Sequence, residues 1–201
     1  EIERHNLERQ LKYLRYQVNP HFFMNTLNNI HALVDINPER AKSTIVELSK
    51  MMRYILYEGN NKLVALPREV QFLQNYVQLM RLRYTDRVRI DVNTPDTLPD
   101  LMMPPLMLII FVENAFKHGI SYRIDSFVEV TINISNDRLL FNCRNSRPPQ
   151  PEEEKKDGGM GLVNVRKRLD LRFPENYKLD IKEGKDIYEV ELDIPLAPNN
   201  Q

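Results

Sequence analysis

Apolar residues recur at helical spacing along the first 84 residues, a stretch whose single glycine is Gly59. The first apolar stripe consists of Leu7, Leu11, Leu14 and Val18. Pro20 interrupts that stripe, and a second one follows, made of Phe23, Leu27, Ile30 and Val34. The two stripes would lie on nearly opposite faces of a straight helix. We therefore expect either a bend at Pro20 or burial of the two halves against different partners.

Two more helices are predicted before residue 84. Asn37 followed by Pro38 is typical of a helix start, and this second helix should end near Gly59. Pro67 opens the third helix. Three helices cannot bury all of these stripes by themselves, so we expect a bundle that a second copy of the chain completes.

The pattern changes near Asp86, where alternating apolar and polar residues begin to predict strands. The predicted strands are 88–92, 127–134, 138–143, 177–182 and 187–194. Ser135, Asn136 and Asp137 separate two of them and indicate a hairpin turn. The second half of the chain is therefore expected to form a mostly antiparallel sheet.

Two helices should cover one face of this sheet. The first is a strongly apolar helix from Pro104 to Gly119, with the glycine as its C-terminal cap. The second runs from Gly161 to about Arg172, after a polar stretch at 145–158 that predicts a mobile loop. The fold class is α+β, with a helical bundle at 1–84 and an α/β sandwich at 85–198.

Composition narrows the possible functions. With 201 residues and 42% hydrophobic residues, the chain can build a substantial core. Lys plus Arg and Asp plus Glu number 28 each, so the chain has no net charge that would attract it to nucleic acid. The single Cys143 excludes a disulfide framework and a multi-cysteine zinc site. The apolar runs are too short to span a bilayer, and we expect a cytosolic piece of a longer protein.

The first candidate for chemistry is His21. Helical geometry places it on one face with Asn25 and Asn28, opposite the second apolar stripe. A solvated imidazole is a nucleophile near neutral pH and can hold a covalent group. The alternative is an ordinary surface histidine, which is how we interpret His5 and His31.

The second candidate lies at the end of the apolar helix, where Asn114, Lys117 and His118 share one face. An amide oxygen can ligate Mg²⁺ beside nucleotide phosphates, and an ammonium group can neutralise those phosphates. The alternative is a polar helix end whose Lys117 and His118 complement the helix dipole.

The third candidate is the glycine-rich turn at 158–161, immediately before a predicted helix. Glycines let the backbone approach phosphate oxygens, and a helix N-terminus offers free N–H groups. The same glycines could also form an ordinary turn. The segment is not a P-loop, because no Gly-Lys-Ser/Thr follows it.

Together these segments resemble the LytS/YehU-type sensor histidine kinases. The similarity rests on QVNPHFFMNTLN (17–28), LSKMMRY (48–54), VENAFKHG (112–119) and GMGLVNVRKRL (159–169). It covers about residues 11–195, and the first and third segments are the specific ones.

The resemblance implies that His21 accepts a phosphoryl group from ATP and that a response regulator receives it. It implies a homodimer and an upstream membrane anchor. Because Phe22 and not a carboxylate follows His21, we offer Glu113, the nearest carboxylate within these motifs, as a possible catalytic base. The resemblance also implies Mg²⁺ on Asn114 and a lid at 145–158. The residues expected around the nucleotide are Asn114, Lys117, His118, Asn145, Gly159, Gly161 and Leu162. Arg168 belongs to the last segment, without an assigned role.

One departure from the family supports a rival hypothesis. Histidine kinases commonly end the strand before the lid in Asp-x-Gly, whereas here Asn145 and Ser146 occupy that end. The rival is a degenerate kinase that acts as a dimeric signalling scaffold without ATP turnover. An ATP-driven clamp with the same nucleotide fold is a third option, but it does not explain His21 and its neighbouring asparagines.

Overall fold

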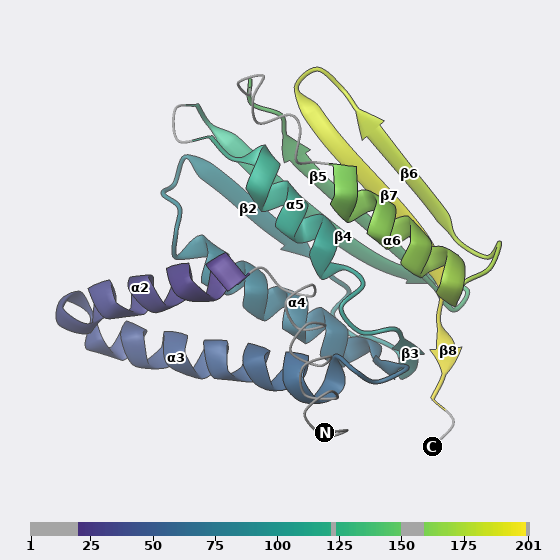
Figure 1. Cartoon of the computed structure of the whole chain (residues 1–201), viewed down its shortest axis with the longest axis horizontal. Helices are drawn as coiled ribbons and strands as arrows, with labels where there is room; N and C mark the ends of the chain where they lie inside the picture. The colour runs from purple at the N-terminus through teal and green to yellow at the C-terminus, as the bar shows by residue number, and fades with distance from the viewer. Residues whose placement is uncertain (1–19, 122–123, 150–158, 200–201) are drawn as a thin grey trace, which may run out of the picture.

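The computed structural model describes residues 20–121, 124–149 and 159–199, and Figure 1 shows how their helices and strands are arranged. The helices are α2 (Pro20–Ile36), α3 (Pro38–Arg53), the π-helical segment η1 (Tyr54–Glu58), α4 (Leu66–Arg81), α5 (Ile109–Gly119) and α6 (Gly159–Arg172). The strands are β1 (Val64–Ala65), β2 (Val88–Asn93), β3 (Leu101–Met103), β4 (Ser126–Ser135), β5 (Arg138–Ser146), β6 (Lys178–Glu183), β7 (Ile187–Pro195) and β8 (Ala197–Pro198). The α+β class is confirmed. The first apolar stripe and residues 150–158 of the expected lid lie outside the described residues.

Helices α2 and α3 form a hairpin whose turn follows the sequence prediction. The side chain of Asn37 accepts a hydrogen bond from the backbone N–H of Arg40, at 3.1 Å. Pro38 is the first residue of α3, where its missing N–H has no intrahelical role. Helix α3 continues into η1, and Gly59 ends that segment as predicted.

The face of α2 that is buried differs from the prediction. Its buried residues are Phe22, Thr26 and Ile30, whereas the predicted stripe placed Leu27 and Val34 in the core. Both of these residues are exposed. A helix with apolar residues on two sides can bury only one of them within a single protomer, and here the side that begins at Phe22 faces the core.

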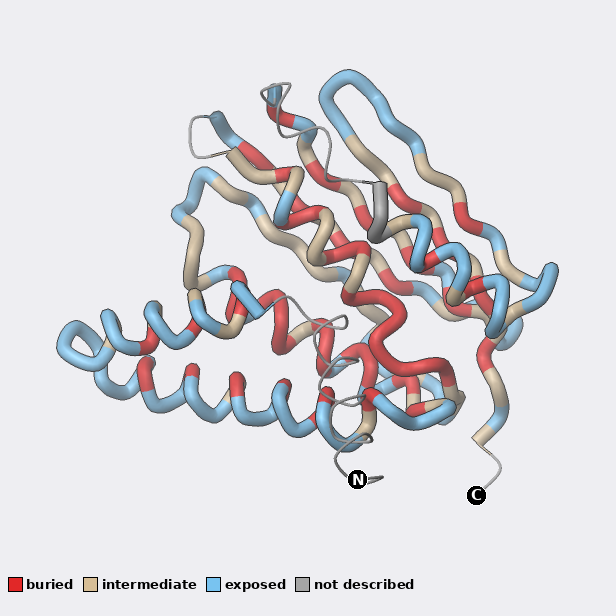
Figure 2. The backbone as a smooth tube through the Cα atoms, viewed as in Figure 1, coloured by how far each residue is buried: buried red, intermediate tan, exposed pale blue. Residues whose placement is uncertain are grey.

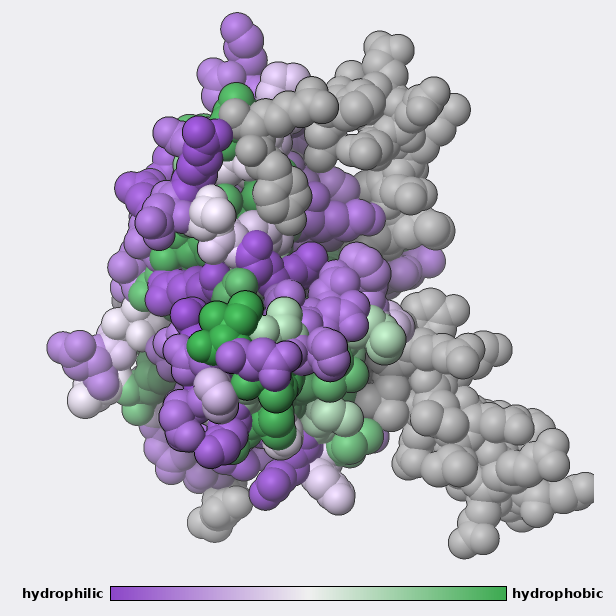
Figure 3. Space-filling model, turned by 90° about the vertical axis from the view of Figure 1, so that its left-hand side faces the viewer, coloured by the Kyte–Doolittle hydropathy of each residue, from purple (hydrophilic) through white to green (hydrophobic). Residues whose placement is uncertain are grey.

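The hairpin of α2 and α3 exposes many large apolar residues. In the space-filling view, apolar side chains collect in the lower part of the face shown, the part that contains the helical region (Figure 3). The large exposed apolar residues of the two helices are Met24, Leu27, Val34, Ile36, Ile45, Val46 and Met52.

The main sheet has the strand order β2-β4-β5-β7-β6, with β2 and β4 parallel and the other pairs antiparallel. This confirms the mostly antiparallel sheet. Asn136 and Asp137 turn β4 into β5 with φ values of 52° and 54°, as a type I′ hairpin requires. A small sheet, β1-β3-β8, was not predicted, because strands of two or three residues are too short to show alternation.

Helices α5 and α6 cover one face of the main sheet (Figure 1). The strands bury their alternate residues beneath these helices (Figure 2). The rings of Phe111 and Phe141 lie 5.8 Å apart between the layers. On the opposite face charges of alternating sign form a row. Arg144 lies 3.4 Å from Glu129 and 3.6 Å from Glu189. The described helices include none that is long and apolar enough to cross a membrane.

Three predicted boundaries were wrong. Helix α5 begins at Ile109 rather than at Pro104, because the preceding residues form strand β3 and a turn. Strand β5 continues through Ser146, so the first two residues of the expected loop belong to the sheet. Helix α6 begins at Gly159, two residues before the predicted start.

Candidate functional site

The polar and apolar faces of α5 separate as the sequence predicts. Val112 and Phe116 are buried against the sheet. Asn114 and His118 are half-buried, and Lys117 is exposed. One side of the helix therefore anchors it in the core, while the other presents an amide, an ammonium and an imidazole within one turn.

The C-terminal end of α5 lies directly against the end of β5. A Cβ atom on Gly119 would lie 2.6 Å from both Cβ and Nδ2 of Asn145. Gly119 ends the helix as predicted, and no described glycine has a positive φ, so it does so without a left-handed conformation. The glycine is needed for close approach, because any side chain here would collide with Asn145.

Asn145 is the polar residue at the end of the buried face of β5 and is only 3% exposed. Its Nδ2 donates to the backbone oxygen of Ser146 at 2.7 Å. The Ser146 hydroxyl donates to the backbone oxygen of Gly119 at 3.0 Å and accepts from the N–H of Phe127 at 2.7 Å. The strand end that lacks Asp-x-Gly is thus an ordered junction of β4, β5 and α5.

His21 lies in the first turn of α2 and is exposed, as the helical spacing predicts. Nδ2 of Asn25 lies 3.1 Å from Nδ1 of His21. The same amide nitrogen lies 3.4 Å from Nε2 of His21, so Asn25 lies beside both ring nitrogens while the ring faces solvent. Asn28 is exposed on the same side of the helix.

A chain of aromatic rings joins α2 to α5 through α4. The ring of Phe22 lies 4.8 Å from that of Tyr76, which lies 6.0 Å from Phe116. Burial raises the pKa of Tyr76, and the negative charge of Glu113 raises it further. Helix α2 is therefore linked to α5 through Tyr76 of α4, the residue on which the charge of Glu113 acts.

Sequence reasoning missed a buried carboxylate on α4. Glu69 is 1% exposed and accepts hydrogen bonds from the Tyr54 hydroxyl at 2.5 Å and from the backbone N–H groups of Leu106 and Met107 at 2.9 and 3.1 Å. Burial raises the pKa of Glu69, and these hydrogen bonds oppose that effect. An acidic residue at a core position of an amphipathic helix, three residues after Leu66, was the available signal.

Arg168 reaches the same turn from α6. Its guanidinium donates to the backbone oxygen of Leu106 at 2.9 Å and to that of Pro105. The sequence placed Arg168 in a family segment without a role, and the structure gives it these contacts.

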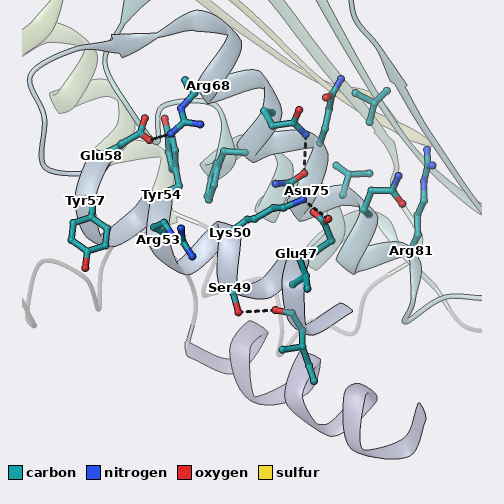
Figure 4. Close-up of a pocket in the computed structure, with 18 residues that line it drawn as sticks. Glu47, Ser49, Lys50, Arg53, Tyr54, Tyr57, Glu58, Arg68, Asn75 and Arg81 are labelled. Carbon is teal, nitrogen blue, oxygen red and sulfur yellow. Dashed lines mark hydrogen bonds and ion pairs between the residues drawn. The ribbon is translucent and has the colours of Figure 1, made fainter. Parts of the chain in front are cut away.

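A large groove of about 1420 Å³ lies between α3 and α4, away from the predicted site residues. Figure 4 shows Lys50 beside Glu47, at 2.9 Å, and Arg68 beside Glu58, at 2.5 Å. Charged residues of both signs line it, so the groove itself does not select an anion or a cation. In the part of the chain that the structure describes, no three His, Cys, Asp or Glu residues are grouped to hold a metal.

The fold and the sequence together define the class of this protein. The family model described as histidine kinase matches residues 9–88. Among solved structures, the histidine kinase domain of the blue-light activated histidine kinase EL346 from Erythrobacter litoralis is similar with a TM-score of 0.52. It is 17% identical and the match covers 95% of each chain, which shows a shared fold. The chain belongs to the histidine kinase family.

The relatives in sequence are sensor proteins named LytS. The one from Oceanobacillus iheyensis is 31% identical over 190 residues, which cover 87% of this chain and 32% of that protein. The sensor histidine kinase/phosphatase LytS from Staphylococcus aureus is 39% identical over 114 residues, which cover 57% of this chain and 20% of that protein. The chain thus spans about a third or less of the length of these relatives.

Proposed function

We propose that this chain is an ATP-dependent protein-histidine kinase that phosphorylates itself on His21 and passes the phosphoryl group to an aspartate of a response regulator. The observation that carries the proposal is the packing of Phe22 on Tyr76 and of Tyr76 on Phe116. These ring contacts link α2, which carries the exposed His21, through α4 to α5, whose polar side carries Asn114 and Lys117, and this link supports the proposal.

In the proposed reaction the unprotonated ring nitrogen of His21 attacks the γ-phosphorus of ATP. A nitrogen–phosphorus bond forms, the bond from that phosphorus to the bridging oxygen breaks, and ADP leaves with the electron pair. The ring then loses its remaining N–H proton. In the transfer step the ring takes up a proton again, an aspartate oxygen of the regulator attacks the phosphorus, the nitrogen–phosphorus bond breaks and His21 leaves as neutral imidazole.

The residues beside the histidine have different roles in this scheme. Asn25 orients the imidazole but cannot take its proton, because an amide is not a base at neutral pH. We assign the base to Glu113, whose charge already acts on Tyr76 beside Phe22. A carboxylate there would receive the proton as the ring becomes cationic.

The nucleotide is proposed to lie between the polar face of α5 and the N-terminal end of α6. Its contacts would come from Asn114, Lys117, His118, Asn145, Gly159, Gly161 and Leu162. The Asn114 amide suits Mg²⁺, which takes few protein ligands and completes its shell with phosphates and water. Bound Mg²⁺ would neutralise charge on the phosphates. Asn145, already bonded to the backbone of Ser146, would form the floor of the site.

We also propose that the chain works as a homodimer through the hairpin and that its parent protein is anchored in the cell membrane with this portion in the cytoplasm. Residues 1–84 would then serve dimerisation and phosphotransfer, and residues 85–198 would bind ATP. The exposed apolar side chains of α2 and α3 support the dimer.

A dimeric scaffold without ATP turnover is the second candidate. The observation in its favour is the junction at Asn145 and Ser146, where an amide and a hydroxyl stand in place of the family's carboxylate and glycine. An amide can still accept a hydrogen bond from an adenine amino group, so this junction weakens the kinase proposal without excluding it.

Incubation with γ-labelled ATP and Mg²⁺ tests the kinase proposal. We expect an acid-labile, base-stable label that falls about a hundredfold or more in His21→Gln, because the acceptor nitrogen is removed. His31→Gln is the matched control, since His31 is exposed on the same helix and should keep the label. Asn114→Ala should lose it, whereas Asn133→Ala, exposed on β4, should not.

Two results would contradict the proposal. A label that persists in His21→Gln places the acceptor elsewhere. A folded chain that takes no label and binds no Mg-ATP in a quantified titration is the scaffold.

A further inference from the structure

The turn between β3 and α5 has an unusual backbone. Leu106 adopts a φ of 54°, in the left-handed region that a branched side chain rarely occupies. Leu106 and its neighbour Met107 are nevertheless fully buried. Such a conformation persists only where surrounding contacts determine it. Those contacts come from two elements that are distant in the sequence.

The N–H side of the turn is bound by a carboxylate from α4. One oxygen of Glu69 accepts from the N–H of Leu106, and the other accepts from that of Met107. A buried carboxylate is retained only where hydrogen bonds replace its water. Here those bonds all go to the turn and to Tyr54.

The carbonyl side of the same turn is bound by a guanidinium from α6. Arg168 donates to the oxygens of Pro105 and Leu106. The peptide groups of residues 105–107 therefore lie between an acceptor on one side and a planar pair of donors on the other. Lysine could reach one of these oxygens but could not reproduce the fork.

We propose that Glu69 and Arg168 are positioning residues that clamp residues 105–107 and so set α5 against α6. The inference rests on the proposed function, since these are the helices assigned to the nucleotide. Helix α5 begins at Ile109, and Asn114 lies five residues further, roughly 7.5 Å along the axis. A shift of the turn would therefore move Asn114 relative to the glycines at the start of α6.

Tyr54 links this clamp to the helical hairpin. Its hydroxyl donates to Glu69, and its ring stacks on Phe72 with centroids 4.6 Å apart. It is also the first residue of η1, where α3 changes to π-helical geometry, a feature frequent at functional sites. A rearrangement at the end of α3 would thus reach the turn through a single hydroxyl.

The test measures Mg-ATP affinity and the labelling rate at saturating ATP separately, at a temperature where circular dichroism shows each variant folded. Glu69→Gln and Arg168→Met should weaken Mg-ATP binding about tenfold or more, the usual size for residues that orient a binding group. Arg168→Lys should recover only part of that loss, because lysine can reach one of the two oxygens but not both. The control Lys167→Met, at an exposed neighbour on α6, should bind as the wild type does.

Tyr54→Phe tests the hydrogen bond from Tyr54 to Glu69 separately from the clamp on residues 105–107. It should keep Mg-ATP affinity within about twofold while the saturated labelling rate falls about tenfold, because the turn keeps both Glu69 bonds but loses its tie to α3. A purely structural role would move both quantities together or neither.

Amide hydrogen exchange tests the clamp without relying on the proposed kinase activity. In Glu69→Gln the amides of Leu106 and Met107 should exchange about tenfold faster, with no change at Ile30 in α2. If the wild type neither binds Mg-ATP nor takes a label, the proposed function fails and this exchange still decides the clamp. Folded Glu69→Gln with unchanged exchange and, in an active protein, unchanged Mg-ATP affinity would overturn it.

Discussion

The helical hairpin of α2 and α3 differs in the burial of its apolar residues from the α/β layer, which consists of the main sheet with α5 and α6. In the layer, Phe111, Ile132 and Phe141 are enclosed by the sheet on one side and by α5 and α6 on the other. In the hairpin, Leu27 and Ile45 face outward although they follow the same helical spacing as the buried residues. Figure 2 shows the contrast: most residues of α2 and α3 are exposed, whereas buried residues alternate with less buried ones along the central strands.

This difference separates a region that completes its own core from one that does not. A large exposed apolar surface on a folded chain usually marks an interaction site. The layer encloses its own apolar residues, whereas the hairpin leaves apolar residues exposed on the face through which we propose that two copies associate. Substitutions in the core of the layer, at the contact of Gly119 with Asn145 and on the outward face of the hairpin should therefore have successively smaller effects on stability.

Removal of a ring from the layer should have the largest effect on stability. Phe141→Ala should lower the free energy of unfolding by about 3–5 kcal/mol, because a 1% exposed ring is lost and its neighbour Phe111 loses a contact. Urea unfolding followed by circular dichroism measures the change. The matched control is Leu140→Ala, one residue away on the other face of β5 and 40% exposed. It should change stability by about 0.5 kcal/mol or less, and equal losses would contradict the layered core.

Gly119→Ala should have an intermediate effect. The added methyl group would lie 2.6 Å from Asn145, so β5 or α5 must shift, at a cost of about 1–3 kcal/mol. The same unfolding measurement applies. In Gly119→Ala/Asn145→Gly both the obstructing Cβ and the amide are absent, so the Gly119→Ala substitution should be less harmful there than in the wild-type background. Simple addition of the two single effects would show that Asn145 is not the group that requires glycine.

Much of the fold could be predicted because the signals are local. Asn37 before Pro38 marks a helix start, and Asn136 with Asp137 marks a turn, each through groups a few residues apart. The turn before α5 could not be predicted in this way. Its residues are apolar and their pattern predicts a helix. Glu69, however, 37 residues earlier, accepts a hydrogen bond from the N–H of Leu106 and thereby stabilises a turn.

In the candidate site, too, local features could be predicted from the sequence, whereas contacts between distant elements could not. Helical spacing alone predicted that Asn114 and His118 lie opposite Phe116. It could not show that Gly119 is needed for contact with Asn145, or that Arg168 reaches the turn before α5, because these contacts depend on how strands and helices pack. Whether the polar face of α5 binds a nucleotide stays a prediction, to be decided by the labelling and titration experiments.

The smallest effect on the protomer itself is expected at Leu27, and it tests the other half of the comparison. Leu27 is 50% exposed on α2, so Leu27→Ser should change the unfolding free energy of an isolated protomer by about 0.5 kcal/mol or less. In a dimer formed through this face, the same substitution should raise the dissociation constant about tenfold, since buried apolar area is lost at the interface.

Sedimentation across a range of protein concentrations measures that constant. Val163→Ser is the matched control, because Val163 is 52% exposed on α6, outside the hairpin, and its substitution should leave association unchanged. Equal weakening in both variants would place the interface elsewhere. A wild-type chain that stays monomeric at every concentration would contradict a dimer through this face. The exposed apolar residues of α2 and α3 would then mark the binding site of a different partner.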